Sequence, residues 1–352
     1  MKQIRFYRLL TALALCNAGS ALAQSCEHPP EWPTAFQIIL PLQGTITVGA
    51  DVPDGTEIYT SRHSSASGAF VRCSGGPGTV SRTDDYIGSP GRPSAFDRVY
   101  ETSIPGVGIA MWYAGTKFPY NAGNINVGTG TLTYNFNKSL DFSLYKIGPI
   151  SAGVLQGSSL PRARQYTGGA GSINLWEAQV VGQLSIVTGT CRVGDVRVPM
   201  GDIPQSTFTG IGSHTAWQRY EVPLTGCPAF FGRRAAYARS DSGTVERADL
   251  RVANRIGVRL DPSTAILDEA RSIIALQPGA PGAPAARGIG IQVAWDDESP
   301  VAFRAFRDSG LPLTATANGS YRIPLRARYY QVEDLVRGGP ANAAMVMTLR
   351  YE

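Results

Sequence analysis

A short stretch in the first half of the sequence concentrates side chains that suit carbohydrate binding. Its aromatic and amide residues are Trp112, Tyr113, Phe118, Tyr120, Asn121, Asn124 and Asn126. Aromatic rings stack on the apolar faces of sugars, and amide groups pair with sugar hydroxyls. The candidate ligand-binding residues are Trp112, Tyr113, Tyr120, Asn121 and Asn124. We expect segment 117–126 to be a loop on the ligand surface, the alternative being that Trp112 and Tyr113 are core and edge residues of a strand.

Residues with catalytic or metal-binding potential are sparse. The three histidines, His28, His63 and His214, stand in polar or turn-like contexts, and none has the spacing of a metal-ligand pair. The sequence also lacks a nucleophile elbow, a phosphate-binding loop and a complete dinucleotide-binding fingerprint. We therefore predict no enzyme activity, no catalytic residue, no metal and no cofactor.

Two pairs of adjacent carboxylates occur, at Asp84–Asp85 and Asp296–Asp297. Neighbouring residues of a strand point to opposite faces, so neither pair can act jointly on one bond. We interpret both pairs as solvated carboxylates in turns.

The charge balance gives no sign of a nucleic-acid partner. The formal net charge is +5, and three of the positive charges, Lys2, Arg5 and Arg8, lie at the start of the chain. Without them the balance is about +2, and nucleic-acid readers concentrate Lys and Arg on one face. Four arginines of the first half are compatible with binding of an acidic or sulfated ligand, the alternative being that they are scattered surface residues. They are Arg72, Arg82, Arg92 and Arg98.

The first 23 residues have the organisation of a secretory signal peptide. Their basic residues precede an apolar stretch from Leu9 to Leu15, and Ala21-Leu22-Ala23 matches an A-x-A cleavage site. The residue before Cys16 is Leu15 rather than a small residue, which argues against a lipoprotein signal. No later stretch approaches the length of about 18 apolar residues that a membrane span needs. We predict an exported protein that is not membrane-embedded.

Four cysteines remain after the signal peptide: Cys26, Cys73, Cys191 and Cys227. An even number in an exported chain indicates two disulfides. Three connectivities are possible, and the spacings favour the local pairs Cys26–Cys73 and Cys191–Cys227.

Alternating and apolar β-rich segments dominate the rest of the chain. With 40 glycines and 24 prolines among 352 residues the sequence is rich in turns, and 43% apolar with 17% charged residues excludes bulk disorder. Strands are expected at 36–42, 128–136, 184–187, 288–295, 321–329 and 344–351. Segment 263–276 holds either one short helix or strand and loop. We predict an all-β protein with two β-sandwich domains.

The chain divides into two halves with one cysteine pair each. We expect a signal peptide at 1–23, an N-terminal domain at 24–186 and a C-terminal domain at 187–352. The junction at 185–190 is short and not proline-rich, which favours a brief extended link. The Pro/Gly/Ala-rich segment 276–288 is interpreted as a surface loop of the second domain, because too few strands follow it for a third.

The last expected strand carries four large apolar residues on one face: Met345, Met347, Leu349 and Tyr351. Such a face belongs in a core with neighbours on both sides, but no antiparallel partner follows in the sequence. Either an earlier strand closes the sheet, or the domain keeps an open groove, which is an aggregation hazard unless another chain fills it. These four residues are our candidate groove residues.

Five segments of the second half follow a shared order of strand and cysteine motifs. They are CRVGDVRVPMGDIPQSTF from Cys191, EVPLTGC ending at Cys227, GIGIQVAW, GSYRIPLRARYYQ, and GGPANAAMVMTLRYE with its penultimate Tyr351. In this order they resemble the pilin domain of chaperone–usher fimbriae. The resemblance implies an immunoglobulin-like sandwich that lacks its seventh strand. Its groove would be filled first by a chaperone strand and later by the N-terminal extension of the next subunit.

The position of this domain in the chain bears on where the subunit would sit. A polymerising pilin donates a strand from a free tail before its first cysteine, whereas a whole domain precedes Cys191. The resemblance therefore implies a tip subunit, exported through the periplasm to the cell surface. The implied partners are a periplasmic chaperone, an outer-membrane usher and the adjacent pilin subunit.

Two segments of the first half, TSIPGVGIAMWY at 102–113 and LDFSLYKIGPISAGVLQGSSL at 140–160, resemble the binding domains of type 1 and type 3 fimbrial adhesins. This resemblance implies a receptor that is a host glycan or a matrix protein, without assigning sugar-contact residues. The alternative is a structural fimbrial adaptor or cap subunit without receptor binding. A secreted glycan hydrolase with a β-sandwich module is the least favoured class.

Overall fold

The protein is all-β, as predicted from the sequence. The computed structural model describes residues 24–63, 70–75, 78–113, 115–127, 132–135, 140–169, 171–234 and 251–352. Within these ranges the helical elements are two short 3-10 turns, η1 (Gly157–Ser159) and η2 (Gln205–Thr207). The expected signal peptide lies outside the described residues, and so do 128–131 and Phe136 of the strand expected at 128–136.

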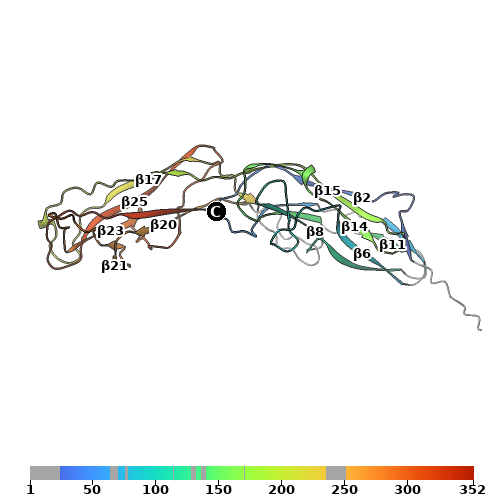
Figure 1. Ribbon diagram of the computed structural model, residues 1–352, viewed down its shortest axis with the longest axis horizontal. Helices are drawn as coiled ribbons and strands as arrows, with labels where there is room; N and C mark the ends of the chain where they lie inside the picture. The colour runs from blue at the N-terminus through green and yellow to red at the C-terminus, as the bar shows by residue number, and fades with distance from the viewer. Residues whose placement is uncertain are drawn as a thin grey trace, which may run out of the picture.

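The first half of the chain forms one elongated unit, drawn from blue to green in Figure 1. Its strands are β1 (Ser25–Glu27), β2 (Phe36–Leu42), β3 (Thr45–Thr47), β4 (Glu57–His63), β5 (Phe70–Ser74), β6 (Gly78–Ile87), β7 (Tyr100–Glu101), β8 (Val107–Tyr113), β9 (Thr116–Lys117), β10 (Tyr120–Val127), β11 (Leu132–Asn135), β12 (Leu140–Lys146), β13 (Gly153–Gln156), β14 (Arg162–Thr167) and β15 (Asn174–Val187).

Two main sheets of this unit enclose one hydrophobic core. One sheet has the order β10-β6-β14-β15-β13, with β2 and β3 parallel to β15, and the other has the order β4-β12-β8-β7. The core joins side chains of both sheets, including Trp176 of β15 and Phe142 of β12, each fully buried. A third, smaller sheet with the order β1-β5-β11 carries the first disulfide.

The long strand β15 holds the larger sheet together because it changes partner along its length. It pairs with β2 from Trp176 to Gly182 and with β3 from Ser185 to Val187. Gly182 lies at the change with φ +104°, and a Cβ there would come within 2.3 Å of the Leu42 carbonyl oxygen. Only glycine fits this close approach of two backbones.

The second half forms a separate unit, drawn from yellow to red in Figure 1. Its strands are β16 (Arg192–Val193), β17 (Gln218–Cys227), β18 (Arg233–Arg234), β19 (Arg251–Val252), β20 (Ile256–Pro262), β21 (Ile266–Asp268), β22 (Ile273–Ile274), β23 (Ile289–Trp295), β24 (Arg307–Asp308), β25 (Gly319–Gln331) and β26 (Met345–Tyr351).

This unit is a sandwich of a large and a small sheet. The large sheet has the order β16-β17-β25-β23-β22-β21, and the small sheet has the order β24-β20-β26. Alternation along β25 and β20 places Leu325 and Val258 in one core between them, each at most 1% exposed. The strand expected at 321–329 is the middle of β25, and the strand at 288–295 corresponds to β23. Segment 263–276 contains strand and loop rather than a helix, and 276–288 is a loop.

The two units lie end to end along the long axis of the molecule (Figure 1). Members of the first core lie between Cys26 and Ile186, and members of the second lie between Cys191 and Tyr351. Strand β15 runs to Val187, one residue past the expected boundary at 186. The link from Thr188 to Thr190 is therefore short and extended.

Candidate functional site

The last strand, β26, has one bonded edge and one open edge. It pairs antiparallel with β20 along its whole length, from Met345 opposite Pro262 to Tyr351 opposite Ile256. It is the outer strand of its sheet among the described residues. Met345 and Met347 are only partly buried. Two side chains of the predicted apolar row, Met345 and Met347, thus face a space that the chain's own described strands leave uncovered.

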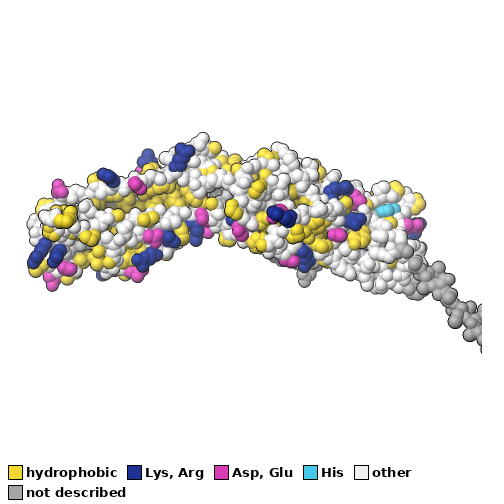
Figure 2. Space-filling model, in the orientation of Figure 1, with side chains coloured by type: hydrophobic (Ala, Val, Ile, Leu, Met, Phe, Trp, Pro, Cys, Tyr) yellow, Lys and Arg dark blue, Asp and Glu magenta, His cyan; other side chains and the backbone are white. Residues whose placement is uncertain are grey.

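Opposite β26, the second wall of this space is the segment 193–203. It begins in β16 and continues without strand pairing, with Val193 44% and Val196 37% exposed. Between the two walls runs a groove of about 1180 Å³. Its floor is apolar and comes from the inner face of the large sheet: Ile291, Val293, Leu325, Ala327 and Tyr329. Figure 2 shows the exposed apolar side chains as a continuous yellow stripe along this half of the molecule.

The segment that leads into β26 is anchored beside the groove. The Tyr329 hydroxyl donates a hydrogen bond to the carbonyl oxygen of Ala341 (3.1 Å), and burial raises the pKa of this phenol above its usual value. Gln205 Nε2 donates to the carbonyl oxygen of Val336 on the same segment. These two bonds fix segment 336–341 at its place beside the groove. An apolar floor beside an unpaired strand edge can accept an extended peptide as an additional strand.

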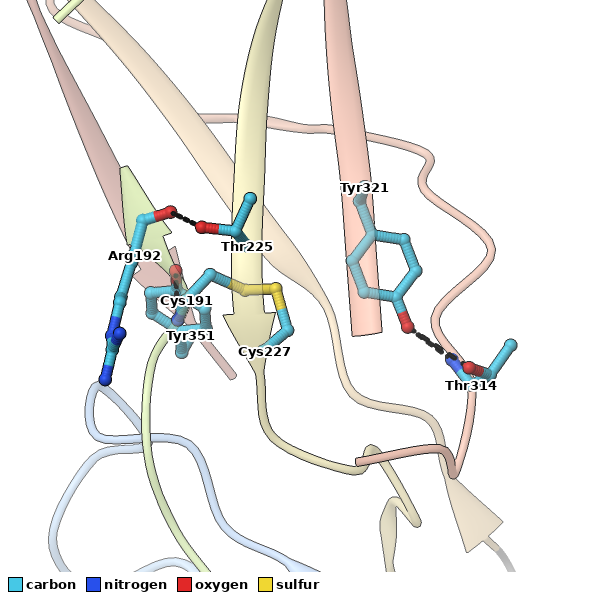
Figure 3. The surroundings of a disulfide bond; sticks show 7 residues. All are labelled: Cys191, Arg192, Thr225, Cys227, Thr314, Tyr321 and Tyr351. Atoms are coloured by element: carbon cyan, nitrogen blue, oxygen red, sulfur yellow. Dashed lines mark hydrogen bonds between the residues drawn. A yellow bond between two sulfur atoms is a disulfide. The ribbon is translucent and has the colours of Figure 1, made fainter. Parts of the chain in front are cut away.

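Tyr351 closes the far end of the groove strand. Its side chain is 5% exposed, and its hydroxyl oxygen accepts a hydrogen bond from the backbone N–H of Cys191 (3.0 Å). Figure 3 shows the ring lying beside the disulfide that joins Cys191 to Cys227. The four candidate groove residues thus differ in position. Met345 and Met347 line the groove, Leu349 packs at the edge of the core, and Tyr351 is inside it.

Both disulfides have the local pairing that the spacing favours. Cys26 is bonded to Cys73 with a Cα–Cα distance of 4.1 Å, and Cys191 is bonded to Cys227 at the same distance. Each disulfide ties the start of one unit to a strand of that unit's own core. The groove unit thus has its own covalent closure, independent of the first unit.

The candidate ligand residues of the first half do not form one site. Tyr113 is 3% exposed and Phe118 is fully buried, so both belong to the core. Trp112 is half-buried on β8, where its Nε1 donates to Ser143 Oγ (3.1 Å). Asn121 and Asn124 are exposed on β10, in the other main sheet. Their part in ligand binding stays a prediction, with the exposed asparagines as the accessible members.

The expectation of a loop at 117–126 is wrong. Thr116–Lys117 is strand β9, and Tyr120–Val127 is strand β10, which pairs with β6 through a bulge between Asn121 and Gly123. Asn121 Oδ1 accepts the Gly123 N–H at this bulge (2.9 Å). The asparagines and glycine that resemble turn residues in the sequence instead shape an edge strand.

The interpretation of Asp84–Asp85 as turn carboxylates is also wrong. Both residues lie in strand β6, between β10 and β14 of the same sheet, and Asp84 is fully buried. Its Oδ1 accepts a hydrogen bond from Gln165 Nε2 (2.9 Å). Burial raises the pKa of Asp84 to about 7, against the opposing effects of side-chain hydrogen bonds with Tyr120 and Gln165 and of the nearby Arg82. Asp84 is therefore a buried acid of the core.

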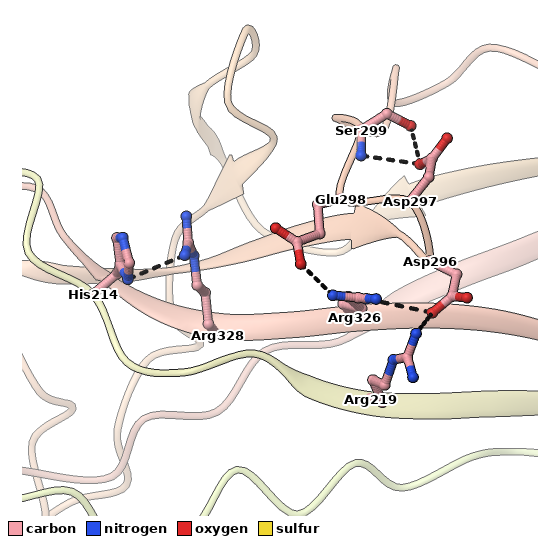
Figure 4. Close-up of polar contacts among 8 residues, drawn as sticks. All are labelled: His214, Arg219, Asp296, Asp297, Glu298, Ser299, Arg326 and Arg328. Carbon is pink, nitrogen blue, oxygen red and sulfur yellow. Dashed lines mark hydrogen bonds and ion pairs between the residues drawn. The ribbon is translucent and has the colours of Figure 1, made fainter.

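By contrast, Asp296–Asp297 follows β23 in a turn, as interpreted. Figure 4 shows the resulting polar network on the outer face of the large sheet. Asp296 Oδ1 pairs with Arg219 (2.9 Å) and Arg326 (3.4 Å). Hydrogen bonds from Ser299 hold the pKa of Asp297 below its usual value. These carboxylates stabilise the surface of the sandwich through ion pairs.

None of the three histidines lines the groove, and they are far apart in the sequence. His214 Nδ1 lies 3.1 Å from Arg328 Nη1 on the outer sheet face (Figure 4), and burial lowers the pKa of His63. Across the described ranges no group of three or more His, Cys, Asp or Glu side chains is placed to hold a metal ion. No helix of that part of the chain is long and apolar enough to cross a membrane.

Three of the four arginines considered for an acidic ligand already have partners. Arg82 Nη2 donates to the carbonyl oxygen of Ala122 (2.8 Å), and Arg92 pairs with Glu101 (2.8 Å). Arg98 donates to the carbonyl oxygen of Lys117 and pairs with its neighbour Asp97. Arg72 is half-buried on β5. These bonds explain the positions of Arg82, Arg92 and Arg98 without a ligand.

Comparison with known proteins finds similarity to fimbrial adhesins. A curated "Fimbria adhesin protein" of Klebsiella pneumoniae is 24% identical over the full length of both chains. The resemblance to fimbrial adhesins is confirmed. No family model matches the sequence.

Two solved structures resemble the chain as well. The CupB6 tip adhesin of Pseudomonas aeruginosa is 13% identical, with 93% of this chain and 95% of that one covered and a TM-score of 0.35. The receptor-binding domain of the adhesin MrkD1P of Klebsiella pneumoniae is 18% identical and has a TM-score of 0.36, with 48% of this chain and 98% of that one covered.

Sequence reasoning identified β26 but missed the opposite wall of the groove. Segment 193–203 has Val196, Val198 and Met200 at alternate positions and belongs to the first of the five motif segments, but alternation alone does not show that it borders an uncovered groove. A weak signal was present, because such a segment next to a cysteine has too many exposed apolar residues for a solvated loop.

Proposed function

We propose that the chain is a fimbrial tip adhesin that enters the fibre by accepting a strand from another subunit. One observation carries this proposal: β26 leaves an open edge over an apolar groove of about 1180 Å³. A strand laid in the groove would gain main-chain hydrogen bonds from β26, and its alternate side chains would cover the apolar floor. Each buried methylene would contribute about 0.8 kcal/mol.

The proposed partners follow from the order in which the groove would be filled. A periplasmic chaperone strand would protect it first, an outer-membrane usher would pass the subunit outward, and the adjacent pilin subunit would supply the final strand. A folded unit with its own core precedes Cys191. With no free tail before the groove unit, the chain would sit at the tip of the fimbrium on the cell surface.

The first unit would bind the receptor, a host glycan or a matrix protein. The exposed asparagines of β10, Asn121 and Asn124, are the accessible polar groups among the candidate residues. A second candidate function is a structural adaptor or cap without receptor binding. The burial of Tyr113 and Phe118 favours this alternative, because it removes two aromatic rings from the expected ligand surface.

A charge placed in the groove tests the proposed function. Met347→Asp would put an unpaired carboxylate under the incoming strand, where burial is costly. We expect the amount of this subunit in sheared fimbriae to fall at least about tenfold. The matched control is Thr348→Asp, because Thr348 points to the other face of β26 and lies opposite Arg259. Equal incorporation of both variants would refute strand acceptance at this groove.

Receptor binding is tested separately from assembly. Bacteria that display the full chain with Asn124→Ala are compared with wild type for adherence to immobilised glycans and matrix proteins. Lower adherence at equal fimbriation supports an adhesin. The absence of adherence by wild type to any surface would favour the structural cap.

A further inference from the structure

A buried cluster of hydrogen bonds joins the two units. Thr47, the last residue of β3, is 2% exposed, and all of its polar atoms bond to the second unit. Its N–H donates to the Gly232 carbonyl oxygen (2.9 Å), and its Oγ1 donates to the Ala229 carbonyl oxygen (2.7 Å). The same Oγ1 accepts the Phe231 N–H (3.0 Å), and the Thr47 carbonyl oxygen accepts Asn254 Nδ2 (3.0 Å).

A second set of bonds lies a few residues further along the first unit. The Asp51 N–H donates to the Tyr351 carbonyl oxygen (3.1 Å), and Asp51 Oδ2 accepts the Tyr351 N–H (2.8 Å). Gly49 lies between Thr47 and Asp51 in the sequence, and a Cβ at Gly49 would come within 2.2 Å of the Tyr351 carbonyl oxygen. The backbones of Gly49 and Tyr351 are therefore in contact. We call these residues the clasp: Thr47, Gly49, Asp51, Asn254 and Tyr351.

The clasp and the groove share one strand. Tyr351 is the last residue of β26, and Met345 and Met347 of the same strand line the groove. Figure 1 shows this strand running along the second unit and ending, at the C mark, between the two units. The Tyr351 side chain is meanwhile fixed inside the second unit by its bond to Cys191. Any change in the position of β26 therefore reaches Asp51 directly.

We propose that the clasp couples the groove to the first unit, so that filling the groove tightens the joint between the units. This rests on the proposed strand acceptance. With one open edge, β26 is held from Met345 to Leu349 by β20 alone, whereas its end at Tyr351 is also held by Asp51 and Cys191. A strand added to the open edge would bond this part of β26 on its second side, so that the strand that carries Tyr351 moves less relative to Asp51. Because coupling is reciprocal, a weakened clasp must also weaken the binding of the strand.

Amide hydrogen exchange measures the clasp directly. The N–H groups of Thr47, Asp51 and Tyr351 each donate one of its bonds. The probe is a synthetic peptide with Val or Ile at alternate positions and Lys at both ends, titrated into the disulfide-bonded full chain. We expect exchange at these three amides to slow by about fivefold or more when the peptide is bound. Unchanged exchange at saturating peptide would overturn the coupling.

Variants of the first unit test the reverse direction. Thr47→Val removes the hydroxyl, and Asp51→Ala removes the carboxylate. Neither residue touches the groove, yet we expect each change to weaken peptide binding about fivefold. The control is Thr79→Val, which makes the same change at an exposed residue of β6. Because Asp51 is exposed, its variant should fold even where Thr47→Val does not.

The outcomes separate the two proposals. Weaker binding by both clasp variants and not by the control supports the coupling. If all three variants bind the peptide as tightly as the wild-type chain, the coupling is overturned and the proposed strand acceptance is unaffected. A wild-type chain that does not bind the peptide overturns strand acceptance, and the coupling falls with it.

Discussion

At the scale of single residues, Asp84 shows where reading the sequence reaches its limit. Strand alternation correctly separates Asp84 from Asp85, but it does not say which face is the core. The core face of β6 includes the Asp84 carboxyl group, which interacts with the side chains of Gln165 and Tyr120. Nothing local in the sequence marks this pairing, because Asp84 and Gln165 are far apart in the chain.

The raised pKa of Asp84 predicts that the first unit is more stable in mild acid. Its pKa is about 7 in the folded chain and 3.8 as the reference value. The contribution of neutral Asp84 to the free energy of unfolding is fully present below about pH 4 and is lost as the pH rises through about 7. The loss is at most about 4 kcal/mol. We expect the melting temperature of the first unit to fall between pH 5 and pH 8, and Asp84→Asn to reduce that fall. Parallel pH profiles for both chains would contradict the assignment.

Tyr120 has a structural role that its sequence context conceals. Its hydroxyl donates to the Tyr113 carbonyl oxygen (3.1 Å), and its ring packs 6.2 Å from that of Phe118. Tyr120→Phe should cost about 1 kcal/mol, and Tyr120→Ala about 3 kcal/mol or more. A Tyr120 that only contacted a ligand would tolerate alanine without loss of thermal stability, and these contacts argue otherwise. Denaturant unfolding of the two variants measures the difference, with Asn124→Ala as the exposed control.

At the scale of elements, alternation was the most informative signal. The strand expected at 36–42 matches β2 residue for residue, and the strand expected at 344–351 differs from β26 by one residue. The prediction of a loop at 117–126 was wrong because Asn and Gly residues occur both in turns and in bulged edge strands. The partner change of β15 also leaves no local pattern, since it depends on where β2 ends and β3 begins.

Gly182 tests that partner change. Gly182→Ala would place a methyl group 2.3 Å from the Leu42 carbonyl oxygen and would strain a φ of +104°. We expect the free energy of unfolding of the first unit to fall by about 2 kcal/mol or more. Gly194→Ala is the control, because a Cβ there has no heavy atom within 4 Å. Equal stability of the two variants in denaturant would show that β15 tolerates a side chain at the change of partner.

At the scale of the whole molecule, the open groove predicts self-association. An apolar groove beside an unpaired strand edge is a template for other chains. The full chain produced without a chaperone should form concentration-dependent oligomers or be degraded, and a strand-like peptide should keep it monomeric. Light scattering after size-exclusion chromatography measures this. Stable monomers at high concentration without any partner would count against an open groove.

The overall division into two β units followed from the cysteine pairs and strand spacing, but the joint between the units did not. Thr47 lies 182 residues before Ala229 in the sequence, and Asp51 lies 300 residues before Tyr351. Contacts at such separations leave no periodicity to read. A short link without proline suggested close neighbours, and only the structure reveals which residues hold them.

The clasp also determines how tension would cross the molecule. A pull between a receptor at the outer end and a fibre at the groove would reach the joint by two routes, the covalent link at Thr188–Thr190 and the bonds at Thr47 and Asp51. As long as those bonds last, the link alone does not bear the load. Separation would then be abrupt rather than gradual, because bonds that share a load give way together.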